Sequence, residues 1–166
     1  MIRSLIVIVL ITVLFDNCST DMKKCTQQVP AADIAAVNQT QLAIDVALID
    51  KYLSDRNITP FKDGALRYVV TTPGSGSAPC LESTIAVTYT GKLMTNGNIF
   101  DSSANATSFS LSSLILGWKI GLLNVSKGAV VTLYIPSGYA YGPTARTGIP
   151  ANSNLIFDIT LADFSN

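Results

Sequence analysis

Alternating apolar and polar positions recur through the second half of the chain. Ile85, Val87 and Tyr89 share one face of such a segment, and the C-terminal segment repeats the pattern around Phe157. A period of two is typical of a strand with one face buried. Turns rich in Pro and Gly separate these segments. The pattern predicts strands over residues 66–73, 83–93, 129–136 and 154–164.

A different periodicity marks residues 31–56. Apolar residues recur there at intervals of three and four, at Leu42, Val46, Ile49 and Leu53. The charged residues, Asp45 among them, are assigned to the rest of the helix surface. This spacing predicts one amphipathic helix of about 25 residues. Its apolar stripe packs either against its own domain or against a second copy, as a homodimer through residues 31–56.

A short helix is predicted over residues 112–123. It contains Trp118, the only tryptophan, together with Gly117 and Gly121. Glycine costs a helix about 1 kcal/mol relative to alanine, so the two glycines need a structural reason. One helix among several strands predicts an α+β fold, in which the helix covers the apolar face of an antiparallel sheet.

The N-terminus resembles an export signal. Arg3 precedes an uncharged apolar run over residues 5–15, which is too short to span a bilayer because about 20 residues are needed. We predict a signal peptide over 1–17, acylation of Cys18 as the first mature residue, and a tether over 18–30. The alternative is an ordinary signal peptide with an unmodified cysteine. Either way the protein is exported, and the only membrane contact predicted is the lipid anchor of an acylated Cys18.

Composition excludes several functions. Eleven basic and eleven acidic residues cancel and form no basic run, which argues against a nucleic-acid partner. Histidine is absent, so catalysis by an imidazole base or by an imidazole-bound metal is excluded. No cofactor or metal is expected. Cys25 and Cys80 are an even pair in an oxidising compartment; they form either a disulfide or two free thiols.

Several motifs together carry a family resemblance. They are VTYTG, IFDSS, FSL, LILGWKIGL, YAYG and GIP followed by LIFDITL. In this order and spacing, they resemble the FKBP-type peptidyl-prolyl cis/trans isomerases over residues 64–164. The resemblance implies a sheet of five or six strands curled around the short helix, with a shallow apolar pocket between them. The isomerase domain is therefore assigned to 64–166, and the preceding helical extension to 31–58.

The resemblance also assigns the site. Catalytic residues are Asp101, Trp118, Tyr141 and Phe157, and substrate-binding residues are Tyr89, Phe100, Phe109, Leu114, Ile115 and Ile149. The Tyr141 hydroxyl and the Ile149 backbone N–H are the implied hydrogen-bond donors, and the indole of Trp118 is the floor. The loop over 142–157 is one residue shorter than is usual in the family. It leaves open whether Arg146 or Thr147 occupies the position where many members carry a histidine.

The implied function is isomerisation of X-Pro bonds in proline-containing polypeptide chains, which assists the folding of exported proteins. The chemistry needs no nucleophile, because amide rotation breaks no covalent bond. The implied location is the periplasmic side of a bacterial membrane. The alternative is a peptide-binding or chaperone module that uses the same pocket without turnover.

Overall fold

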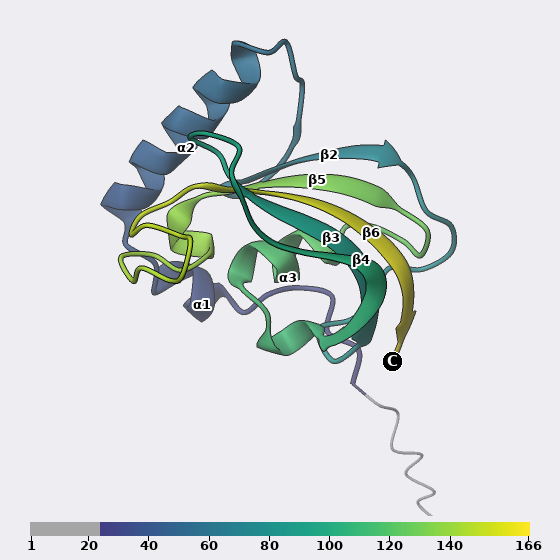
Figure 1. Ribbon diagram of the computed structural model, residues 1–166. Helices are drawn as coiled ribbons and strands as arrows, with labels where there is room; N and C mark the ends of the chain where they lie inside the picture. The colour runs from purple at the N-terminus through teal and green to yellow at the C-terminus, as the bar shows by residue number, and fades with distance from the viewer. Residues whose placement is uncertain (1–23) are drawn as a thin grey trace, which may run out of the picture.

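The computed structural model describes residues 24–166 and has an α+β architecture (Figure 1). The strands are β1 (Phe61–Asp63), β2 (Leu66–Thr72), β3 (Thr84–Leu93), β4 (Ile99–Ser110), β5 (Val130–Ile135) and β6 (Leu155–Ser165). The helices are α1 (Ala31–Ala35), α2 (Gln39–Ser54) and α3 (Leu116–Leu122), with short 3-10 turns η1 (Leu111–Ser113) and η2 (Ser137–Tyr139). The predicted fold class is confirmed.

All six strands form one antiparallel sheet in the order β1-β2-β5-β6-β3-β4. The sheet curls around α3, which lies in its concave face, while α2 lies outside the sheet (Figure 1). The four strands expected from alternation are present. The alternation did not indicate β1 or β4. The first is only three residues long, and β4 is a largely exposed edge strand in which a bulge between Ser103 and Thr107 interrupts the register.

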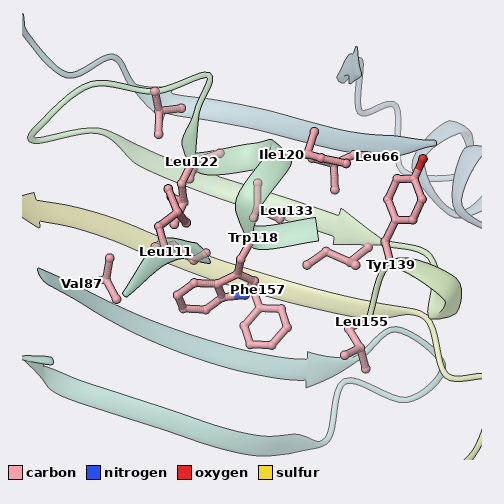
Figure 2. Close-up of a cluster of buried hydrophobic side chains, with 14 of the residues drawn as sticks. Leu66, Val87, Leu111, Trp118, Ile120, Leu122, Leu133, Tyr139, Leu155 and Phe157 are labelled. Atoms are coloured by element: carbon pink, nitrogen blue, oxygen red, sulfur yellow. The ribbon is translucent and has the colours of Figure 1, made fainter. Parts of the chain in front are cut away.

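The helix α3 is shorter than the predicted 112–123, because η1 occupies the start of that segment. Its glycines have the expected role. A Cβ on Gly117 would lie 2.5 Å from Cγ2 of Ile135, and one on Gly121 would lie 2.7 Å from Cδ2 of Leu133. Both β5 side chains are fully buried. The absence of Cβ atoms therefore lets α3 pack directly on β5, within the apolar cluster that also contains Trp118 (Figure 2).

The prediction of one helix over 31–56 is wrong, because the segment forms two helices. The break falls at residues 36–38, where Asn38 caps α2 by accepting a hydrogen bond from the Gln41 backbone N–H at 3.1 Å. Ile49 and Leu53 of α2 pack against Tyr134 and Ile156 on the outer face of the sheet. The apolar stripe thus packs on its own domain. It is not available as the interface that the predicted homodimer through residues 31–56 would use.

The burial of Asp45 also differs from the prediction. The sequence interpretation placed it among the solvated charges of the helix, but only 1% of its surface is exposed. It follows Leu42 by three residues and precedes Ile49 by four, so it lies on the same buried face as those residues. A buried carboxylate requires hydrogen-bond donors, and its donors lie in η2 and in α2 itself.

The described part of the predicted tether is fastened to the domain. Cys25 and Cys80 form a disulfide with a Cα–Cα distance of 5.1 Å. The Thr26 hydroxyl donates to Glu82 at 2.6 Å, and the Leu81 backbone N–H donates to the Thr26 carbonyl at 2.9 Å. The signal peptide over 1–17 and the acylated Cys18 lie outside the described residues. Within residues 24–166, no helix is long and apolar enough to cross a membrane.

Candidate active site

A cavity of about 200 Å³ opens between α3 and the concave face of the sheet. It is lined by Tyr89, Phe100, Asp101, Phe109, Leu114, Ile115, Trp118, Tyr141 and Phe157. These residues come from β3, β4, the turn before α3, α3 itself, the loop after η2, and β6. The structure therefore brings together every predicted site residue except Ile149, which is buried but does not line the cavity.

Gly91 of β3 makes room for two of the cavity's rings. A Cβ at this position would lie 2.7 Å from an atom of Phe100 and 2.7 Å from an atom of Phe157. Those two rings meet edge to face, with centroids 5.5 Å apart and planes at 83°. A side chain at position 91 would displace one wall of the cavity. The glycine of the VTYTG motif is therefore required for steric reasons.

Trp118 is the centre of the aromatic arrangement. Its ring meets Phe157 at 5.2 Å and 86°, Tyr89 at 5.4 Å and 81°, and Phe109 at 6.3 Å and 82°. The adjacency of Trp118 and Phe157 is visible in Figure 2. Edge-to-face pairs are worth about 0.5 to 1.5 kcal/mol each beyond their buried area. The cavity walls are therefore held by mutual contacts of the rings, with 4% of the Trp118 surface exposed.

The polar groups of the cavity are two phenols and one carboxylate. The Tyr89 hydroxyl donates a 2.8 Å hydrogen bond to Oδ2 of Asp101. Burial, and next this bond to Asp101, raise the pKa of Tyr89 to about 12. Burial also raises the pKa of Tyr141, with a further contribution from the charge of Asp101 and an opposing one from Arg146. Both phenols therefore keep their protons at neutral pH and act as hydrogen-bond donors.

Comparison with known proteins decides the family. The family model described as FKBP-type peptidyl-prolyl cis-trans isomerase matches residues 76–162, which is more than half of the chain. The chain belongs to this family. The matched residues begin just before β3 and end within β6. The elements α1, α2, β1 and β2 lie outside the match.

Curated relatives agree with the FKBP-type assignment. The chain is 38% identical over 117 residues to the FKBP-type peptidyl-prolyl cis-trans isomerase FkpA of Escherichia coli K12, covering 69% of this chain and 43% of the relative. It is 45% identical over 104 residues to FkpA of Buchnera aphidicola subsp. Acyrthosiphon pisum, covering 61% of this chain and 43% of the relative. The chain thus spans less than half the length of these relatives.

Solved FKBP-type structures share the fold. The crystal structure of FkpA from Escherichia coli aligns with a TM-score of 0.66 at 34% identity, covering 76% of this chain and 62% of that one. A peptidyl-prolyl cis-trans isomerase from Pseudomonas syringae pv. tomato aligns with a TM-score of 0.62 at 31% identity, covering 84% and 98%.

The structure corrects one donor that the FKBP-type resemblance implied. The Ile149 backbone N–H donates to the Arg146 carbonyl at 3.0 Å, and the Arg146 N–H donates back to the Ile149 carbonyl at 2.8 Å. This closed pair occupies the Ile149 N–H within the loop. By contrast, the N–H of Ile115, in the cavity wall just before α3, has no acceptor among residues 24–166.

Of the two candidates for the position of the family's histidine, Arg146 lies beside Tyr141, a residue of the cavity lining. The guanidinium of Arg146 lies 5.6 Å from the centroid of the Tyr141 ring, within cation–π range.

Proposed function

We propose that this chain is an active peptidyl-prolyl cis-trans isomerase that acts on proline-containing polypeptides. The observation that carries the proposal is the cavity of about 200 Å³ with six aromatic rings and few polar groups in its lining. Such a site fits a prolyl ring and the amide that precedes it. Its substrate is a peptide segment, since the cavity is open to solvent on one side and contains no set of groups for covalent chemistry.

The reaction needs a preference for the twisted amide. Amide resonance opposes rotation with a barrier of about 18 to 20 kcal/mol. The planar amide is a strong dipole whose charge separation falls as the bond twists. A cavity walled by aromatic rings solvates the planar dipole less well than water does, so it disfavours the planar state relative to the twisted one. An acceleration of about 10,000-fold requires about 5.5 kcal/mol of this preference.

Hydrogen-bond donors in the cavity orient the bound peptide. The Tyr141 hydroxyl lines the cavity, has no partner among the described residues, and keeps its proton because burial raises its pKa. We assign it, with the Ile115 backbone N–H, as a donor to the carbonyl groups of the bound segment. Asp101 accepts from Tyr89 and presents its negative charge to the cavity. It orients the substrate.

A direct assay tests the proposal. The purified chain should accelerate cis-to-trans conversion of Leu-Pro and Phe-Pro test peptides. Tyr141→Phe and Asp101→Ala should each slow it by about five- to tenfold, the effect of about one hydrogen bond. Tyr68→Phe and Asp163→Ala make the same chemical changes outside the cavity and should keep the wild-type rate. A wild-type rate equal to that of buffer would overturn the proposal, and peptide binding without turnover would favour the chaperone module.

We also propose that the protein is exported and anchored through Cys18, with the domain on the periplasmic side of a bacterial membrane. The disulfide between Cys25 and Cys80 supports export, because such bonds persist in oxidising compartments. An acyl chain on Cys18 should place the wild type in the membrane fraction and add its mass to the N-terminal peptide. Cys18→Ser should release the protein into the soluble fraction. An unmodified Cys18 in purified protein would contradict the anchor.

A further inference from the structure

A buried hydrogen-bond cluster joins α2 to η2. The side chain of Asp45 accepts two bonds from Ser137 at the same oxygen, one from the hydroxyl at 2.6 Å and one from the backbone N–H at 3.0 Å. The backbone N–H is shared with Oδ1 of Asn154, also at 3.0 Å, whereas the hydroxyl donates to Asp45 alone. Its other oxygen accepts from the Gln41 amide at 2.9 Å. Asp45 and Ser137 are each 1% exposed, so water does not compete for these bonds.

Ser137 in turn holds the backbone on both sides of Tyr141. Its carbonyl accepts the N–H of Ala140 at 3.0 Å and the N–H of Gly142 at 2.8 Å. The Gly142 carbonyl then accepts the N–H of Asn152 at 2.8 Å, which ties down the far end of the loop over 143–151. The position of Tyr141 at the cavity therefore depends on where Ser137 is held.

Close packing also holds η2 against the N-terminal helical segment. Gly138 lies directly under Val37, whose Cγ1 fills the space that a Cβ on residue 138 would need, and Leu42 of α2 lies nearby. A second carboxylate fastens α2 elsewhere, since Asp50 forms two bonds with Arg67, at 2.7 and 3.0 Å. The helix α2 is therefore held to the domain at two points, and η2 packs against it.

We infer that Asp45 is a positioning residue for the active site: through Ser137, it sets the place of the Tyr141 hydroxyl. This inference rests on the proposed isomerase function. It gives a role in the reaction to a helix that the family match over 76–162 does not include, because Asp45 lies outside that match and Ser137 lies inside it. The N-terminal helix is thereby part of the active-site support.

Two isosteric variants separate the hydrogen bond from the volume that it fills. Asp45→Leu keeps the size of the side chain but removes the acceptor, and kcat/KM should fall about tenfold, mainly through kcat. Asp45→Asn keeps an amide oxygen for Ser137 and should restore most of that loss. Asp50→Asn weakens the other fastening of α2; it should lower the thermal midpoint and leave kcat/KM unchanged.

A double-mutant cycle tests the route through the hydroxyl. In the Tyr141→Phe background, Asp45→Leu should have no further effect on kcat/KM. Equal losses in both backgrounds, or an equal loss in Asp50→Asn, would show that Asp45 only stabilises the fold and would overturn the inference.

Amide hydrogen exchange tests the positioning independently of activity. In Asp45→Leu, the amides of Ala140 and Gly142 should exchange at least about tenfold faster than in wild type, while Asp50→Asn leaves them protected. Unchanged protection in Asp45→Leu would refute the inference. If the wild type were inactive, the proposed function would fail by the peptide assay, and the exchange measurement would still decide whether Asp45 holds the loop.

Discussion

Replacement of Trp118 by leucine tests whether one residue serves as both core and cavity floor. The indole is 4% exposed and makes edge-to-face contacts with Phe157, Tyr89 and Phe109. Leucine retains apolar contact with the core but has no flat face on which a prolyl ring can stack. The substitution should therefore lower both the free energy of unfolding and the rate of isomerisation.

Two opposing contributions set the size of the loss in stability. Three edge-to-face contacts at about 0.5 to 1.5 kcal/mol each amount to about 1.5 to 4.5 kcal/mol. Against this, Nε1 of Trp118 is buried without an acceptor among the described residues, and removal of an unpaired donor recovers about 1 to 3 kcal/mol. The midpoints of these two ranges, about 3 and about 2 kcal/mol, leave an expected net loss of about 1 kcal/mol in the free energy of unfolding.

Urea unfolding and the peptide assay measure the two effects separately. The urea midpoint should fall with an unchanged m-value, and kcat/KM should fall more than about tenfold at a temperature where the variant stays folded. Leu122→Ala is the matched control, because Leu122 is fully buried on the same helix but does not line the cavity. It should lose about 2 to 5 kcal/mol of stability and keep its rate per folded molecule. A Trp118→Leu variant with lower stability but a wild-type rate would refute the floor role.

Three further changes have defined outcomes. Gly117→Ala should lower the free energy of unfolding by about 1 to 2 kcal/mol, because overpacking against Ile135 outweighs the gain in helix propensity; a stabilised variant in urea unfolding would contradict the close approach. Replacing both Cys25 and Cys80 by alanine removes a disulfide between residues 55 positions apart, and the free energy of unfolding should fall by up to about 4 kcal/mol in thermal or urea unfolding. The isomerisation rate should be unchanged, and a variant that loses this rate would contradict a purely stabilising role for the disulfide. Tyr89 has a folded pKa of about 12 against 10.0 when unfolded, so its contribution to stability is complete below pH 10 and is lost as the pH rises toward 12. Urea midpoints should show that decline in wild type and a smaller one in Tyr89→Phe, and equal declines would refute the assignment.

Sequence patterns predicted the fold where burial is one-sided. Alternation located β3 and β6 because their apolar positions face the core, as at Ile85 and Phe157. It did not indicate β4, whose side chains are mostly exposed at the sheet edge, although this strand supplies Phe100, Asp101 and Phe109 to the cavity. The order of motifs located those residues, since periodicity carries no signal for a strand without a buried face.

Backbone hydrogen bonds and tertiary contacts were the part that the sequence could not give. The Ile149 N–H was assigned as a donor to substrate, but its acceptor is decided by the turn that returns it to Arg146. Asp45 had a readable signal, because its spacing from Leu42 and Ile49 puts it on the buried face. A charge at such a position indicates a buried partner, but only the folded chain identifies that partner as Ser137.

The rigidity of the cavity comes largely from residues that do not line it. Gly117 lets α3 press against β5 and so fixes the height of the Trp118 floor, while Asp45 holds the turn that carries Tyr141. An apolar pocket selects the twisted amide only if its donors and walls do not relax around the planar one, since a yielding pocket binds both states equally and gains no rate. Substitutions behind the cavity should therefore reduce kcat more than they weaken peptide binding, whereas substitutions in the lining should change both.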